Sequence, residues 1–282
     1  MQVESPWYVD WQNQKHASVF DGRHALTERQ LVKNYEAFND VRMLNEYVVR
    51  QPLSELLEVG CATGEFHRYL RIRHPDCTYT GMDISQPAVQ RAQEKYPKAR
   101  FALLPAEVPL KEGLREAGLA DSFPAVYSKD VLHHQVQPWS FLAQLLEAAR
   151  DLLILRTRTR DRGTTVLDPA LSCQYHYNGW MPFIVFNLNE LTEAIRRQVP
   201  GAEILIYRNP MILGGRENRF LPKECYLPET GTAETAVGIF LKTSGPGKVT
   251  LQDREDMNPR YTPAYRLRSA FERLRKSSPR RA

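Results

Sequence analysis

Hydrophobic and polar positions follow two alternating patterns along most of this chain. Short apolar runs of the kind that form buried β-strands recur at 56–59, 78–83, 100–104, 124–130, 152–158, 202–207 and 235–243. Segments with apolar residues every three or four positions separate most of these runs and predict helices. This alternation predicts one α/β domain with extensions, whose last two strands form an antiparallel pair around the excursion 209–233.

The helical segments carry recognisable end signals. Helices are predicted at 25–50, 65–72, 88–96, 139–150 and 187–197. Thr27 with Gln30 resembles a capping box, and Asn187 is a favourable N-cap for the last helix. Ser85 and Pro87 supply an N-cap and an early helical proline for the helix at 88–96.

The first strand runs into a turn between two glycines, which a helix follows. Glu58 and Gly60 end the strand, and Gly64 opens the helix. Glycine adopts backbone angles that side chains resist, and it lets a ligand approach the backbone closely. The second strand ends in Asp83, whose carboxylate is placed to accept the two hydroxyls of a ribose. The turn therefore predicts a nucleotide site, although plain packing at a strand–helix junction also favours such glycines.

The spacing of the glycines separates two kinds of nucleotide cofactor. Dinucleotide sites have G-x-G-x-x-G, whereas Gly60 and Gly64 give G-x-x-x-G. The pattern E-x-G-x-x-x-G-x-F, with an acid at the end of the next strand, resembles the class I S-adenosylmethionine-dependent methyltransferases over residues 55–160. The resemblance implies a three-layer Rossmann-like sandwich with a seven-stranded, mostly parallel sheet whose last strand is antiparallel. It also implies S-adenosyl-L-methionine as the cofactor.

The resemblance further implies which residues contact that cofactor. The turn passes under the methionine part, and Asp83 holds the ribose. Pro105 stands where many members of the family have an aspartate, so the resemblance keeps the backbone contact of the Ala106 N–H with the adenine. Glu107 either substitutes for the missing side-chain contact or is a solvated loop carboxylate, which is the more common case. The cofactor-binding residues predicted in this way are Glu58, Gly60, Cys61, Ala62, Gly64, Asp83, Ile84, Ala106, Glu107, Lys129 and Asp130.

The fourth strand continues into Leu132, His133 and His134, which resembles the family segment that lies beside the transferable methyl group. A histidine there could accept the proton of an acceptor hydroxyl, because its ordinary pKa of about 6.5 suits a general base. His133 and His134 are therefore the predicted catalytic residues. Histidines in such a position also cap or pack against the following helix.

Residues for the methyl acceptor are expected in three places. Tyr35 lies in the predicted helix 25–50, which in the resembled family closes over the cofactor as a lid. The alternation of Arg156, Arg158 and Arg160 places charges on one side of an extended chain, facing an acidic acceptor or solvent. The segment 168–187 is rich in aromatic residues and interrupted by proline and glycine, which predicts a loop over the mouth of a pocket or a loop that buries its own rings. The predicted substrate residues are Tyr35, Arg156, Tyr175, Tyr177 and Trp180.

Composition adds constraints on partners and location. Seven basic residues and one acid lie in 266–282, so this tail carries +6 and the remaining chain −1, and the folded body offers no basic face for nucleic acid. The four cysteines lack metal-binding or paired spacing, so we expect reduced thiols and no metal. The sequence shows no apolar run of membrane-spanning length and no signal-peptide pattern, which predicts a cytoplasmic protein.

The predicted organisation has three parts. Residues 1–50 form an N-terminal arm, which includes Trp7, Tyr8, Trp11 and Phe20, and a lid helix. Residues 51–245 form the methyltransferase-like domain, with substrate-side loops at 168–187 and 209–233. Residues 246–282 form a basic, partly disordered tail with a short helix at 265–276.

Four functions are compatible with this organisation, in decreasing order of support. The first is methyl transfer to an oxygen or nitrogen of a small molecule or glycan. The second is an RNA or protein methyltransferase anchored by the basic tail, although the strand-four segment lacks the signatures of nucleic-acid methylases. The third is a non-catalytic scaffold with the same fold, and the fourth is a nicotinamide oxidoreductase. The sequence does not identify the acceptor, the choice between His133 and His134, or the oligomeric state.

Overall fold

A computed structural model describes residues 17–18, 26–177, 179–214, 218–242 and 247–256. The predictions for the N-terminal aromatic arm and for the basic tail 266–282 lie outside the described residues. Within the described part, no helix has the length and apolar character needed to cross a membrane. The cytoplasmic location stays a prediction from the sequence.

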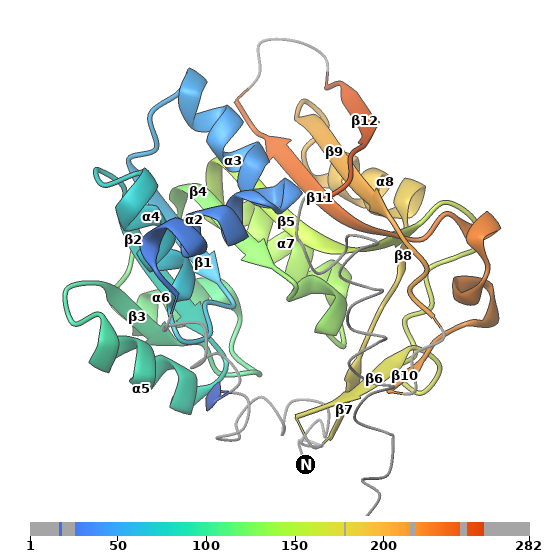
Figure 1. Ribbon diagram of the computed structural model, residues 1–282, viewed down its shortest axis with the longest axis horizontal. Helices are drawn as coiled ribbons and strands as arrows, with labels where there is room; N and C mark the ends of the chain where they lie inside the picture. Colours follow the sequence, from blue (N-terminus) through green and yellow to red (C-terminus); the bar gives the residue numbers. More distant parts are fainter. Residues whose placement is uncertain (1–16, 19–25, 178, 215–217, 243–246, 257–282) are drawn as a thin grey trace, which may run out of the picture.

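A large, mostly parallel sheet forms the centre of the molecule (Figure 1). All seven predicted strands are present, and their order β3-β2-β1-β4-β5-β11-β9 places the two halves of the chain on either side of β1 and β4. Strand β11 is antiparallel to both β5 and β9, as predicted for the last strand. The strands are β1 (Glu55–Val59), β2 (Thr78–Asp83), β3 (Arg100–Leu103), β4 (Phe123–Lys129), β5 (Ala149–Arg160), β9 (Glu203–Pro210) and β11 (Ala233–Phe240).

Two further strands extend this sheet beyond the prediction. Strand β12 (Val249–Asp253) lies beyond residue 245, where the sequence placed the end of the domain, and pairs in parallel with β9. The short β8 (Phe186–Asn187) pairs with the end of β5. Strand β12 was missed because its alternating residues are mostly polar, as expected for a strand at the exposed edge of a sheet.

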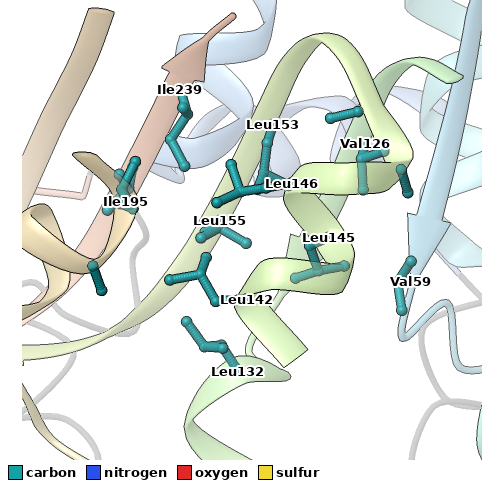
Figure 2. Packing of buried hydrophobic residues seen from close by; sticks show 14 of the residues in the cluster. Val59, Val126, Leu132, Leu142, Leu145, Leu146, Leu153, Leu155, Ile195 and Ile239 are labelled. Carbon is teal, nitrogen blue, oxygen red and sulfur yellow. The ribbon is translucent and has the colours of Figure 1, made fainter. Parts of the chain in front are cut away.

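Helices cover both faces of the sheet and create two apolar cores. The first core contains the buried side chains of α6 (Leu110–Glu116), α7 (Pro138–Ala148) and α8 (Leu188–Gln198). Figure 2 shows Leu142 and Leu145 of α7 packed near Leu153 and Leu155 of β5. The second core contains those of α2 (Glu28–Glu36), α3 (Asn39–Arg50), α4 (Glu65–Arg73) and α5 (Gln86–Lys95). The three predicted layers are therefore present.

The predicted lid helix 25–50 is two helices, α2 and α3, separated at Ala37 and Phe38. The capping box that starts α2 is confirmed, because Thr27 Oγ1 accepts the N–H of Gln30 and Gln30 Oε1 accepts the N–H of Thr27. Phe38 has an extended backbone, which ends the helical path before Asn39 restarts it. The apolar spacing continues across this break, so the sequence pattern did not reveal it.

A second, small sheet is built from the two segments that the sequence predicted as loops. Strands β6 (Cys173–His176) and β7 (Gly179–Pro182) are antiparallel neighbours, and β10 (Arg219–Phe220) joins them from the excursion 209–233. Two short 3₁₀ turns, Lys223–Tyr226 and Pro228–Thr230, complete the excursion. Segment 168–187 is thus a hairpin, whose aromatic residues suit strands, instead of an irregular loop.

Candidate functional site

The turn after β1 has the backbone that its glycines predict. Gly60 and Gly64 have φ angles of +91° and +80°, and a Cβ on Gly60 would lie 2.2 Å from Val131 Cγ2. The N–H groups of Gly60 and Cys61 both donate to Met82 O, at 2.7 and 3.0 Å. The turn is therefore tied to the end of β2, and no larger residue fits at position 60.

Asp83 connects this turn with the end of β2. Its Oδ2 accepts the Ala62 N–H at 2.7 Å, and its Oδ1 accepts the Ser85 N–H at 2.9 Å. Ala62 has a φ of +48°, a left-handed conformation that this hydrogen bond helps to hold. A carboxylate offers about four lone-pair sites, so Asp83 keeps acceptor capacity for further donors. The buried hydroxyl of Ser85 has no hydrogen-bond partner in the described part of the chain.

These groups fit the nucleoside part of S-adenosylmethionine. A ribose carries two neighbouring hydroxyls that donate to a carboxylate, which is the capacity that Asp83 retains. The Ala106 N–H, which follows the end of β3, donates to no acceptor within the described residues. Pro105 begins a turn closed by the Val108 N–H to Pro105 O, and Glu107 is exposed beside it. The carboxylate of Asp83 and the N–H of Ala106 are therefore chemically compatible with a sugar and an adenine.

Glu58 lies under the turn and is buried. The Tyr79 hydroxyl donates to Glu58 Oε2 at 2.5 Å. Burial raises the pKa of Glu58 to about 8, with the Tyr79 hydrogen bond and the charge of Lys129 acting in the opposite direction. At neutral pH this side chain is mostly a neutral acid. Cys61 is buried beside it, and burial raises the pKa of its thiol as well.

His133 and His134 lie in a short 3₁₀ turn, Leu132–His134, just after β4. Both rings are almost covered, with 1% and 8% of the residue exposed. Pro182 O accepts a hydrogen bond from His134 Nδ1 at 2.7 Å, so His134 carries its proton on Nδ1 and keeps a lone pair on Nε2. His133 Nδ1 lies 3.5 Å from Thr157 Oγ1. Burial lowers the pKa of His134 to about 4 and that of His133 well below its usual range.

The end of β7 covers these histidines. The Ile184 N–H donates to His133 O at 2.8 Å, and the ring of Phe183 meets both histidine rings edge-on, at 5.2 and 5.9 Å between centroids. Arg219 of β10 lies 4.2 Å over the Phe183 ring. The small sheet therefore reaches the predicted catalytic residues through the chain that follows β7.

Charged side chains from β4, β5 and β11 form a buried cluster next to the histidines. Asp130 Oδ2 accepts Arg156 Nη1 at 2.9 Å, and its Oδ1 accepts Arg158 Nη1 at 2.8 Å. Glu234 bridges the same two guanidinium groups from β11. Burial opposes ionisation of Asp130, but Arg156 and Arg158 outweigh it and hold its pKa well below the usual range.

Asp130 combines ionisation with access to solvent. Its φ is +59°, a left-handed conformation that aspartate tolerates better than most residues, and 33% of its side chain is exposed. Strained backbone of this kind often occurs at functional sites. Asp130 is thus an ionised carboxylate at the carboxyl end of β4, held from one side by two arginines.

The start of α3 packs on the face of the sheet that carries Arg156 and joins this cluster there. The Tyr127 hydroxyl of β4 donates to Asp40, and Lys129 Nζ lies 3.7 Å from the same carboxylate. Lys129 also lies 3.7 Å over the Phe38 ring. The predicted cofactor residue Lys129 is therefore directed at the junction of α2 and α3.

The structure separates the predicted substrate residues into three groups. Tyr35 packs on Phe66 of α4, near the glycine turn. Arg156 is buried among carboxylates, so its charge is already compensated within the chain. Tyr175 and Trp180 face each other across β6 and β7 and are about half exposed. The Tyr177 ring is tilted against the His176 ring at 3.9 Å between centroids, and the backbone of Tyr177 has a φ of +52°.

Sequence reasoning missed the acidic partners of the arginines. Asp40, Glu234 and Asp256 are buried, yet each is separated from Arg156 by at least 78 positions in the sequence. The alternation of Arg156 and Arg158 was the available signal, because two buried cations on one side of a strand require anionic partners. Which acids supply them depends on the fold. Arg158, Phe183 and Arg219 were not singled out as site residues either.

Comparisons with known proteins extend these observations. Residues 57–152, which run from β1 into β5, match a family model described as a methyltransferase domain. A trans-aconitate 2-methyltransferase of Paracidovorax citrulli (strain AAC00-1) is 35% identical over 72 residues, or 24% of this chain. That alignment spans 28% of the length of the relative.

Similar solved structures include two that contain a bound nucleoside. The N-terminal domain of EvdMO1 with S-adenosylhomocysteine bound has a TM-score of 0.48 and 17% identity, over 72% of this chain and 81% of that one. The phosphoethanolamine N-methyltransferase 2 of Haemonchus contortus, in complex with S-adenosyl-L-methionine, has a TM-score of 0.47 and 13% identity, over 82% and 60% of the two chains.

Proposed function

We propose, from the premise that this chain belongs to the class I S-adenosylmethionine-dependent methyltransferases, that it transfers a methyl group to an oxygen or nitrogen of a small molecule or glycan. One observation carries the proposal. Asp83 accepts the Ala62 N–H of the glycine turn with one oxygen and the Ser85 N–H with the other, and it retains acceptor capacity for a ribose within the segment 57–152 that matches the family.

The chemistry sets what the chain must contribute. S-adenosylmethionine supplies a methyl carbon that its sulfonium already activates, so displacement by an acceptor lone pair needs no covalent help from the protein. Alignment and exclusion of water can lower such a barrier by about 7–11 kcal/mol when both partners are well held. We assign the ribose to Asp83, the adenine to the Ala106 N–H, and the methionine part to the turn between Gly60 and Gly64.

An acceptor hydroxyl also has to lose its proton. His134 is oriented as a base requires, because Pro182 O accepts the hydrogen bond from its Nδ1 and fixes the ring. A pKa of about 4 makes His134 a weak base. Such a base can remove the hydroxyl proton of the acceptor once the new oxygen–carbon bond begins to form, because that bond makes the proton more acidic. An amine acceptor that enters uncharged would need no such base for the methyl transfer itself.

We place the acceptor between the cluster around Asp130 and the small sheet. Two observations support this placement. Phe183, with Arg219 over its ring, packs against the histidines, and the side chain of Asp130 is open to solvent. The half-exposed pair Tyr175 and Trp180 offers flat apolar faces with polar edges, which suit a sugar or an aromatic ring.

The proposal is tested by calorimetric titration with S-adenosylhomocysteine. Asp83→Asn keeps the size of the side chain but removes its charge, so we expect binding to weaken roughly 10- to 100-fold, from about 1.5–3 kcal/mol of charge-assisted hydrogen bonds. Asp121→Asn, which changes an exposed carboxylate paired with Arg115, is the matched control and should bind like the wild type. Wild-type protein that does not bind the nucleoside at millimolar concentration would contradict the proposal.

A further inference from the structure

Helix α3 begins without a capping side chain of its own. Its N-cap residue is Phe38, whose side chain forms no hydrogen bond to the helix, so the first N–H groups need another acceptor. Asp256 supplies one from 217 positions away, because its Oδ1 accepts the Asn39 N–H at 2.8 Å. Both residues are buried. A carboxylate at this end also interacts favourably with the helix dipole.

The residues that follow β12 hold the same helix at several further points. Asn39 Nδ2 donates to Arg254 O at 2.6 Å, and Arg42 Nη1 donates to Glu255 O at 3.2 Å. Arg254 Nη1 pairs with Glu46 Oε1 at 2.8 Å, one turn further along α3. Figure 1 shows β12 beside β9 at the edge of the large sheet, which brings the segment 254–256 to this place. We call residues 254–256 the C-terminal clasp.

The clasp also reaches the charged cluster at the strand ends. Asp256 Oδ2 lies 3.5 Å from Arg156 Nη2, and Arg156 in turn binds Asp130. The next residue of α3, Asp40, accepts the Tyr127 hydroxyl and lies 3.7 Å from Arg156 Nε. Asp256 therefore contacts the start of α3 with one oxygen and Arg156 of β5 with the other.

We propose that Asp256 is a positioning residue for the methyl-transfer site. It fixes the start of α3 to the carboxyl ends of β4 and β5. In this way it keeps Phe38, Lys129 and Asp130 in the arrangement that binds the nucleoside cofactor. This inference rests on the proposed function. A cap alone does not require such a residue, because a serine or asparagine at position 38 would serve α3 without burying a charge. Unlike a cap at position 38, an acid at position 256 also contacts Arg156.

Two substitutions separate the contacts of Asp256. Asp256→Asn keeps an oxygen that can accept the Asn39 N–H but removes the charge facing Arg156, whereas Asp256→Ala removes both. We expect the Kd for S-adenosylhomocysteine to rise in the order wild type, Asp256→Asn, Asp256→Ala, reaching about tenfold for the alanine variant. The matched control is Asp253→Ala, which removes a carboxylate of β12 that pairs with Arg208 and does not contact α3.

Hydrogen exchange provides a second measurement that does not depend on a stable variant. In the wild-type protein, added S-adenosylhomocysteine should slow exchange at the amides of residues 39–43 and 254–256 together. Wild-type protein that does not bind the nucleoside overturns the proposed function. If the wild-type protein binds the nucleoside, two results would overturn the positioning role of Asp256 alone. One is an unchanged Kd in Asp256→Ala, and the other is no added protection of the amides at 39–43 and 254–256.

Discussion

At the scale of single residues, the carboxylates at the strand ends differ according to their surroundings. Asp83 accepts two backbone N–H groups, Asp130 lies between two arginines, and Glu58 is buried against a tyrosine hydroxyl. The sequence predicted Glu58, Asp83 and Asp130 as cofactor residues through the family resemblance, and the acid that ends the second strand was the signal for Asp83. It did not predict the raised pKa of Glu58. The hydrogen bond from Tyr79 and the burial of both side chains arise only when β1 pairs with β2.

Glu58 gives a prediction on the pH dependence of folding. Its pKa of about 8 in the folded protein exceeds its value of about 4.5 in the unfolded chain, so folding favours the protonated form. Its contribution to stability is therefore complete below about pH 4.5 and is lost progressively as the pH rises toward 8. Glu58→Gln removes this dependence. Between pH 5 and 8 we therefore expect the free energy of unfolding of the variant to rise relative to that of the wild type, by up to about 1.4 kcal/mol per pH unit.

Urea unfolding at pH 5 and pH 8 measures this difference. Glu55→Gln, which changes a carboxylate at the half-buried start of the same strand, serves as the control for general effects of charge. A difference between Glu58→Gln and the wild type that stays constant across this pH range would show that Glu58 is ionised in the folded protein.

At the scale of elements, end signals in the sequence located some boundaries and failed at others. The capping box of α2 and the N-cap Asn187 of α8 were predicted, because each signal lies within three residues of the bond that it makes. The break between α2 and α3 was not, because the cap of α3 comes from Asp256. The hairpin of β6 and β7 was mistaken for a loop, since proline and glycine outweighed the strand preference of its aromatic residues.

The capping box of α2 yields a prediction at this scale. Thr27→Ala removes the acceptor of the Gln30 N–H, and we expect the free energy of unfolding to fall by about 1 kcal/mol. Thr27→Ser keeps a hydroxyl at the same place and should remain close to the wild type. Chemical unfolding curves of the two variants give the comparison, and equal midpoints would mean that the start of α2 adds nothing to global stability.

At the scale of the whole molecule, the net charge hides how the charges are distributed. Residues 1–265 carry a net charge of −1, yet Arg156 and Arg158 are buried against Asp40, Glu234 and Asp256, and the partly exposed Asp130 contacts both arginines. These acids come from α3, from the end of β4, from β11 and from the clasp. The hydrophobic pattern predicted β4, β5 and β11 but not the meeting of four distant acids, because such contacts follow from strand order and chain direction.

The role of the C-terminal region can be tested with two shortened chains. A chain that ends at residue 256 keeps β12 and the clasp, and we expect its melting temperature to remain within about 2 °C of the full chain. A chain that ends at residue 245 leaves the edge of β9 unpaired and α3 without the acceptor from Asp256, so we expect a loss of about 5 °C or more. Scanning calorimetry measures both, and equal melting temperatures would contradict a structural role for β12.

The small sheet is assembled from two excursions that leave the large sheet after β5 and after β9, and it meets the predicted catalytic turn at residues near Pro182 and Phe183. Lengthening, shortening or exchanging either excursion therefore leaves the strand order and the glycine turn intact. On the proposed function, related chains would diverge in what they methylate while inheriting the nucleoside half unchanged, and engineered chimeras would follow the same division.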